Sequence, residues 1–139
     1  MPRSAQPRAT IDDVTPDELV RTFIKHIEAK DLDSACALMS DDCEYDNVPM
    51  SKVFGPDAVK QILVPFTAGC SEIDWVIVRQ SASGDMTSGV VLNERVDRFK
   101  MGERWIELPL AGVFEIANGK ISLWRDYFDL PTFQKAMAG

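Results

Sequence analysis

From Ser71 onward the sequence is a series of β-strand patterns, and this run constrains the fold more than any other feature. Four segments rich in Val, Ile, Trp and Phe are separated by turn signals, at residues 73–80, 88–100, 103–117 and 120–128. Asn118-Gly119 is typical of a type I′ hairpin turn, and Met101-Gly102 also suits a tight connection. The last three strands are therefore predicted to form an antiparallel meander. A further short strand is predicted at 43–48.

Helix signals precede these strands. The segment Thr-Pro-Asp-Glu at 15–18 supplies an N-cap hydroxyl, a proline at the first helical position and a capping-box glutamate. An apolar stripe at helical spacing follows, formed by Val20, Phe23, Ile24 and Ile27. A short helix is predicted over 31–39, and a third helix from residue 56, which Pro65 should end or kink. A closing helical turn is predicted over 131–137.

Helices followed by a long antiparallel sheet predict an α+β fold, in which the helices cover one face of a curved sheet. The 139 residues suffice for one domain of common size and are too few for two. Residues 1–11 are rich in Pro, Ala, Arg and Ser without apolar periodicity, so we expect a mobile N-terminal arm there. Residues 12–139 are expected to form the single domain.

Charge and cysteine content disfavour several classes of partner. The 15 Lys and Arg against 22 Asp and Glu give a net charge of −7, which disfavours binding to nucleic acid. Cys36, Cys43 and Cys70 contain no C-x-x-C spacing, so neither a disulfide framework nor a metal site is expected. No apolar segment reaches the roughly 18 residues of a membrane span. We therefore expect a soluble cytoplasmic protein with no membrane partner.

Polar side chains fall on strand faces that also carry large apolar residues. Trp124, Asp126 and Phe128 share one face of a strand, which places a carboxylate between two aromatic rings. Arg95 and Asp97 share a face of another strand in the same way. Because an arginine can satisfy several carboxylate oxygens at once, Arg95 is the predicted partner of Asp126.

The same residue types also occur in purely structural roles. An arginine two residues from an aspartate on a strand is often a surface ion pair, and a buried acid can cap a loop. His26, the only histidine, lies off the apolar stripe of the first predicted helix and is expected to be solvated. The acidic residues between 28 and 44 lack calcium-loop spacing, so a solvated face is expected there. Tyr45 and Asn47 share a strand face and together could hold a water molecule.

Three segments taken together resemble the limonene-1,2-epoxide hydrolases. They are Tyr45-Asp46-Asn47, then Asn93-Glu94-Arg95-Val96-Asp97, then Trp124-Arg125-Asp126-Tyr127-Phe128-Asp129. The likeness extends from about residue 14 to residue 135. It implies the cone-shaped α+β fold of nuclear transport factor 2, in which a curved mixed β-sheet and helices enclose a deep apolar pocket.

The resemblance also implies a role for each site residue. Asp126 takes the place of the family's general base, Asp97 that of the acid that protonates the epoxide oxygen, and Arg95 that of the cation between them. Tyr45 and Asn47 take the places of the residues that hold the attacking water. The pocket lining is expected to be Ile24, Ile27, Phe66, Cys70, Leu108, Leu110 and Phe133.

The implied activity is the addition of water to a hydrophobic epoxide, cyclic and terpenoid epoxides included, to give a vicinal diol by one-step general acid/base catalysis. The resemblance implies a homodimer and no cofactor or metal. Two other functions stay open on the same fold. One is an isomerase or lyase related to the steroid Δ5-isomerases, although a cation beside the base would depress its basicity. The other is a ligand-binding module without catalytic activity.

Overall fold

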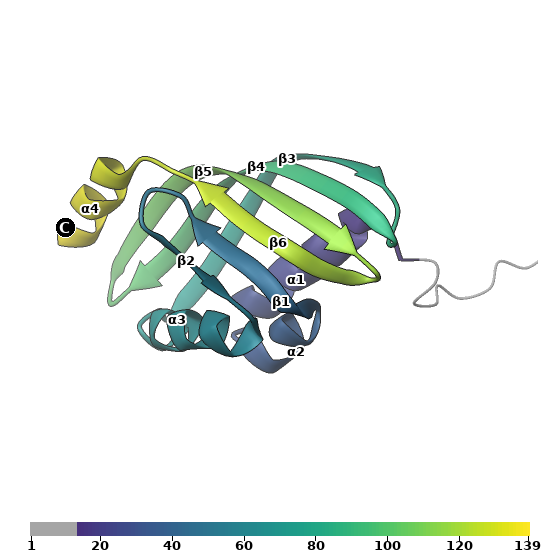
Figure 1. Ribbon diagram of the computed structural model, residues 1–139. Helices are drawn as coiled ribbons and strands as arrows, with labels where there is room; N and C mark the ends of the chain where they lie inside the picture. The colour runs from purple at the N-terminus through teal and green to yellow at the C-terminus, as the bar shows by residue number, and fades with distance from the viewer. Residues whose placement is uncertain (1–13) are drawn as a thin grey trace, which may run out of the picture.

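The computed structural model describes residues 14–139, and the N-terminal arm expected at 1–11 lies outside the described residues. Four helices and one six-stranded sheet make up this part of the chain (Figure 1). In chain order the elements are α1 (Pro16–Glu28), α2 (Leu32–Ala37), β1 (Met39–Asn47), β2 (Ser51–Phe54), α3 (Pro56–Ala68), β3 (Glu72–Gly84), β4 (Ser88–Met101), β5 (Arg104–Ala117), β6 (Lys120–Tyr127) and α4 (Leu130–Ala138).

The sheet is mixed, with the strand order β2-β1-β6-β5-β4-β3. Strands β3 to β6 are antiparallel neighbours, whereas β1 runs parallel to β6. The predicted α+β fold and the predicted meander of the last three strands are therefore confirmed. Helices α1, α2 and α3 lie on one face of the curved, open sheet, and α4 lies beyond its end (Figure 1). The core fills the space between these helices and the sheet.

Helix α1 begins where its capping signal predicts. Thr15 is the N-cap, and its side chain and that of Glu18 form the complete capping box. The apolar stripe then packs against the inner face of the sheet, where the ring of Phe23 meets the edge of Trp124 at a centroid distance of 5.0 Å. Phe23 and Trp124 are both fully buried. The amphipathic pattern of α1 thus buries its apolar face against the sheet.

The structure differs from the predicted elements at three strands. Strand β3 continues to Gly84, four residues beyond the predicted end at 80. Strand β1 begins at Met39, where a helix was predicted, because Met39 pairs with Ile121 of β6 and draws residues 39–42 into the sheet. Strand β2 was not predicted. It is an edge strand that is mostly exposed, so its four residues carry no apolar alternation.

Helix α3 continues three residues past Pro65 and ends at Ala68, with Gly69 as its C-cap. Pro65 lies in the last turn, so the helix loses only the single N–H donor that proline lacks. The closing helical turn is confirmed as α4. Within residues 14–139, no helix has both the length and the apolar character that crossing a membrane would require.

Candidate active site

One row of residues crosses the sheet and carries much of the candidate site. In the strand register, Asn47 of β1 is the partner of Asp126 of β6, which is the partner of Gly112 of β5. Gly112 in turn is the partner of Asn93 of β4. The parallel pairing of β1 with β6 therefore brings residues separated by most of the chain into one row on the inner face.

A buried arginine joins two buried carboxylates next to this row. Nε and Nη2 of Arg95 donate to the two carboxylate oxygens of Asp97, each at 3.0 Å. Nη2 also donates to Oδ2 of Asp126 at 3.0 Å. The exposed fractions are 0% for Arg95, 5% for Asp97 and 3% for Asp126. This pairing is the one the sequence predicted, and its burial separates it from a surface ion pair.

Aromatic side chains complete the surroundings of these charges. Nε1 of Trp124 donates to Oδ1 of Asp126 at 3.2 Å, so each oxygen of that carboxylate has one donor. The ring of Trp75 lies 5.5 Å from the guanidinium carbon of Arg95. Tyr45 stacks on Trp124 at a centroid distance of 3.9 Å. Water is therefore largely excluded from the ion pairs, which strengthens their interaction.

The surroundings of Asp97 favour its protonated form. Burial raises the pKa of Asp97 to about 6, and the negative charges of Asp126 and Glu28 act in the same direction against the opposing effect of Arg95. Burial works against the positive charge of Arg95, but the two carboxylates outweigh it and hold its pKa above the usual value. Burial and the charge of Asp126 raise the pKa of Tyr45, so its hydroxyl stays protonated.

Gly112 is a site residue for which the sequence analysis assigned no role. A methyl group at this position would lie 2.4 Å from Nη1 of Arg95, 2.5 Å from Oδ1 of Asn93 and 3.1 Å from Oδ1 of Asp126. Only glycine leaves room for the guanidinium at this point of β5. A glycine inside a predicted strand is itself a signal of close approach, and it could have identified this position.

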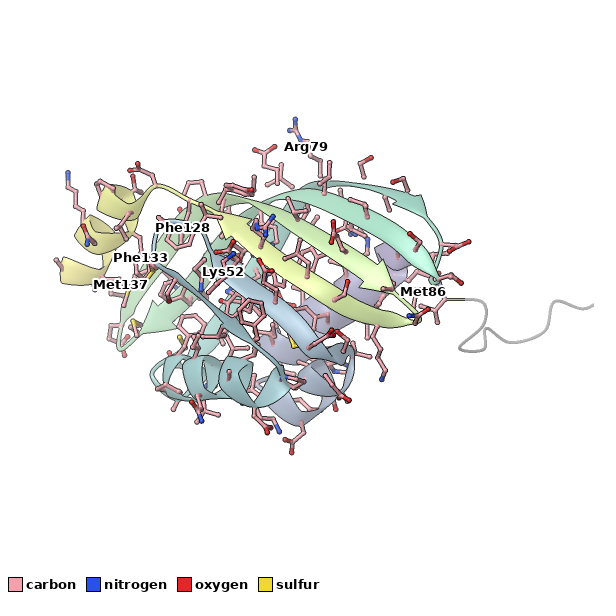
Figure 2. All side chains as sticks on the ribbon, viewed as in Figure 1. Lys52, Arg79, Met86, Phe128, Phe133 and Met137 are labelled. Atoms are coloured by element: carbon pink, nitrogen blue, oxygen red, sulfur yellow. The ribbon has the colours of Figure 1, made fainter. Side chains whose placement is uncertain are left out.

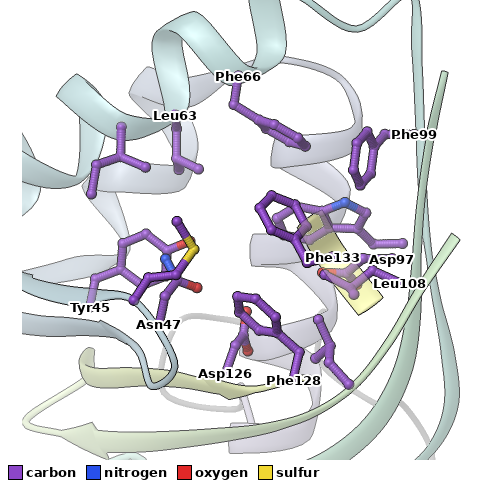
Figure 3. Close-up of a pocket in the computed structure, with 14 residues that line it drawn as sticks. Tyr45, Asn47, Leu63, Phe66, Asp97, Phe99, Leu108, Asp126, Phe128 and Phe133 are labelled. Atoms are coloured by element: carbon purple, nitrogen blue, oxygen red, sulfur yellow. The ribbon is translucent and has the colours of Figure 1, made fainter. Parts of the chain in front are cut away.

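The polar group opens onto a cavity of about 160 Å³. Tyr45, Asn47, Asp97 and Asp126 line it together (Figure 3). Much of the remaining wall is apolar, with Leu63 and Phe66 facing Asp126 across the cavity (Figure 3). Such a cavity, with apolar walls and a few polar groups at one point, is typical of a site for a small organic molecule.

Four of the seven expected apolar residues line this cavity, namely Phe66, Leu108, Leu110 and Phe133. The other three do not. Ile24 and Ile27 of α1 are buried in the hydrophobic core, because the apolar stripe of α1 packs into that core and away from the cavity. Cys70, just after α3, is also buried in the core. The lining residues that were not expected are Met50, Ile62, Leu63, Trp75, Phe99 and Phe128.

Helix α4 and the segment before it close one end of the cavity. Phe128 and Phe133 lie near each other beside α4 (Figure 2), with their rings edge to face at 5.6 Å. No residue of α4 is fully buried. The wall at this end therefore consists of partly exposed aromatic side chains.

The acidic residues between 28 and 44 do not converge. Within residues 14–139, no three His, Cys, Asp or Glu side chains are grouped so that they could hold a metal ion. His26 lies on α1, is partly exposed and is absent from the cavity lining. The titratable groups that reach the cavity are thus Tyr45, Asp97 and Asp126.

Several known proteins are similar to this chain. Residues 14–138 match the limonene-1,2-epoxide hydrolase catalytic domain. The chain is 33% identical over 111 residues to epoxide hydrolase EphG of Mycobacterium tuberculosis, covering 80% of this chain and 71% of that protein. It is similar to the structure of an LEH-like epoxide hydrolase of M. tuberculosis, with 30% identity, 86% of each chain covered and a TM-score of 0.72. A putative polyketide cyclase of Pseudomonas putida, 18% identical with a TM-score of 0.73, shares the fold over 88% of this chain and 98% of its own.

Proposed function

The chain belongs to the limonene-1,2-epoxide hydrolase family, and we propose that it adds water to a small hydrophobic epoxide in one step to give a vicinal diol. The observation that carries this proposal is the buried group of Asp97, Arg95 and Asp126 at one point of an apolar cavity. Two carboxylates that differ in protonation can supply a base and an acid to the same reaction.

In the proposed reaction Tyr45 and Asn47 hold a water molecule against Asp126. Asp126 takes a proton from this water, and the oxygen of the water forms a bond to an epoxide carbon. At the same time the bond from that carbon to the epoxide oxygen breaks. Asp97 gives its proton to the departing oxygen. The raised pKa of Asp97 supports this role, since its side chain is protonated up to a higher pH than an ordinary aspartate. Transfer of one proton from Asp126 to Asp97 then restores the starting state.

The apolar walls support a hydrophobic substrate, and they exclude competing water from the reacting carbon. Cyclic and terpenoid epoxides are the classes we propose first. Because water attacks the carbon from the side opposite to the breaking bond, a cyclic epoxide should give a trans diol. No cofactor takes part in this scheme, since the three side chains and water balance every proton and bond.

A panel of cyclic, terpenoid and styrene-type epoxides tests the proposal, with diol formation measured by chromatography. We expect at least one epoxide to be hydrolysed by the parent protein, and the same epoxide to be hydrolysed about 10³-fold more slowly by Asp126→Asn. A Δ5-3-ketosteroid in the panel tests the isomerase reading. Isomerisation of that steroid without any diol would replace the proposal with an isomerase, and tight binding without any product would replace it with a binding module.

The rate should fall as the pH rises. Because Asp97 must be protonated to act as the acid and its pKa is raised to about 6, the active form is present below that pH and is lost above it. We expect kcat/KM to fall about tenfold per pH unit above this value. Initial rates at low substrate between pH 5 and 9 provide the measurement, with thermal unfolding at each pH as the control. A rate that is constant over this range would contradict the assignment of Asp97.

Tyr45→Phe and Asn47→Ala should reduce the rate less than loss of either acid. These two side chains position the water and give up no proton in the proposed reaction, so each loss should lower kcat about 10- to 100-fold. Steady-state kinetics with the best epoxide of the panel measures this. If Tyr45→Phe abolished turnover as completely as Asp97→Asn, Tyr45 and not Asp97 would be the acid.

We also propose a homodimer formed through the outer face of the sheet. Apolar residues on this face are exposed, among them Val76, Val90, Leu92 and Tyr127, and helices α1 to α3 cover the opposite face (Figure 1). Light scattering on a sizing column should give twice the chain mass. Leu92→Glu, which places a charge on this face, should give the monomer mass. A monomeric parent protein would contradict this assembly.

A further inference from the structure

Two amides and a carboxylate link Arg95 to the first turn of α1. Nη1 of Arg95 donates to Oδ1 of Asn93 at 3.1 Å, and Nδ2 of Asn93 donates to Oε1 of Gln80 at 3.0 Å. Nε2 of Gln80 donates to Oδ1 of Asp17 at 2.8 Å and to the backbone carbonyl of Asp17 at 3.2 Å. None of Asn93, Gln80 and Asp17 lines the cavity, so the proposed reaction does not use them directly.

These side chains form a hydrogen-bond chain from Arg95 to Asp17, and every bond of it points from donor to acceptor in that direction. Arginine has only donors, so Asn93 must turn its oxygen toward Arg95 and its NH₂ toward Gln80. Gln80 must then present its oxygen to Asn93 and its NH₂ to Asp17, whose carboxylate only accepts. The hydrogen-bond chain therefore leads from the cation of Arg95 to the anion of Asp17 without a break. Hydrogen bonds aligned in this way strengthen one another.

A β-bulge makes this arrangement possible. Before the bulge Trp75 points inward on β3, and the register shifts between Ile77 and Arg79, so that one extra residue lies on this strand. After the bulge the inward positions have the opposite parity, and Gln80 becomes the register partner of Asn93. Gln80 thereby extends the row of Asn93, Gly112, Asp126 and Asn47 to the edge strand. Without the bulge Gln80 would point away from α1.

The hydrogen-bond chain contacts the one nitrogen of the Arg95 guanidinium, Nη1, that the two acids do not bind. Nε and Nη2 of Arg95 are held by Asp97 and Asp126, whereas Nη1 has Asn93 as its partner. Arg95 is fully buried and Asn93 is 6% exposed, so water cannot replace Asn93 without rearrangement. Without a partner at Nη1 the guanidinium could change its orientation, and its distances to both carboxylates would then change together.

We propose that Asn93 and Gln80 are positioning residues that hold the guanidinium of Arg95 in its orientation toward both acids, with Asp17 as the fixed end of the hydrogen-bond chain. This proposal rests on the proposed function, because that orientation matters only for a reaction in which both acids take part. The hydrogen bond from Gln80 and the charge of Arg21 lower the pKa of Asp17, which supports a charged carboxylate at the end of the chain.

Gln80→Leu tests the proposal, because it removes both hydrogen-bonding groups at similar volume. We expect kcat to fall about tenfold with KM changed less than twofold, as for a small displacement of a reacting group. The pH above which kcat/KM falls should also rise, because a loosened Arg95 stabilises the charged form of Asp97 less while Asp126 and Glu28 stay in place. Arg21→Ala is the matched control. It removes the exposed partner of Asp17 and leaves the chain intact.

A second measurement needs no substrate and separates this proposal from the proposed function. In ¹⁵N-labelled protein the Nε–H of Arg95, bonded to Asp97, should exchange slowly with water, and Gln80→Leu should accelerate its exchange at least about tenfold. Arg21→Ala should leave it unchanged. Should Gln80→Leu fail to fold, Asp17→Ala at its partly exposed site should change exchange and pH dependence in the same direction. Unchanged exchange together with an unchanged pH dependence would overturn the proposal, whatever the change in thermal stability.

Discussion

Asp126→Asn and Asp97→Asn should each lower kcat for epoxide opening about 10³-fold, since each removes one of the two groups that move a proton. Asn at 126 can still accept from Arg95, but its NH₂ then faces the N–H donor of Trp124. Asn at 97 keeps an acceptor for Arg95 and has no acidic proton to give. Because each variant keeps an acceptor for Arg95, both should fold, and thermal unfolding checks this beside the kinetics.

The two acids act as one unit, so the double variant should be hardly slower than either single variant. Asp74→Asn is the matched control, because Asp74 also pairs with an arginine across β3 and β4 but lies outside the cavity lining, with a side chain that is 49% exposed. It should keep the parental rate. Near-parental turnover by Asp97→Asn would contradict the acid assignment, and independent, multiplying effects would contradict a shared proton.

Gly112→Ala should lower kcat at least about 100-fold, which is the effect expected when a reacting group is displaced by about 1 Å. The added methyl would lie 2.4 Å from Nη1 of Arg95, and Arg95 cannot retreat because Asp97, Asp126 and Asn93 hold it. Overpacking of this kind should also destabilise the fold by about 1–3 kcal/mol. Kinetics and denaturant unfolding together measure both effects.

Gly69→Ala is the control for this substitution. Gly69 caps α3 with an ordinary negative φ of −80°. A methyl there would lie 3.3 Å from the flexible end of Met101, and at ordinary contact distances of 3.5 and 3.6 Å from the backbone oxygens of Pro65 and Phe66. It should change neither the rate nor, by more than a few tenths of a kcal/mol, the free energy of unfolding. A Gly112→Ala variant with the parental rate would show that the reaction tolerates displacement of Arg95. It would then refute the claim that the position of Arg95 relative to the two acids matters.

The alternation of side chains along strands predicted much of the polar group. It placed Arg95 and Asp97 on one face and Asp126 between two aromatics, and both assignments needed only the period of two. The order of the elements likewise predicted the helices and the meander. What the alternation could not supply is the parallel pairing of β1 with β6, which decides that Asn47 lies beside Asp126. That placement came from the family resemblance.

Parity along a strand fails as a guide wherever a bulge intervenes. Trp75 and Gln80 both point inward although their numbers differ in parity, because the register of β3 shifts between them. Nothing in the residues at 77–79 marks this shift, so the chain from Arg95 to Asp17 could not be predicted. The apolar stripe of α1 did not predict the cavity lining correctly either. The stripe identifies the buried face of the helix, but it does not tell whether Ile24 and Ile27 line the cavity or pack in the core.

The proposed one-step attack by water can be tested most directly by a single turnover in ¹⁸O-water with enzyme in excess over the best epoxide. Direct attack places the label in the diol of the first turnover and leaves the peptide that carries Asp126 unlabelled, because Asp126 removes only a proton. An ester formed by Asp126 would instead deliver its own oxygen, so the first diol would be unlabelled and the Asp126 peptide would gain mass. We expect labelled diol and an unchanged peptide. Unlabelled diol, or a mass gain on Asp126, would contradict the one-step reaction.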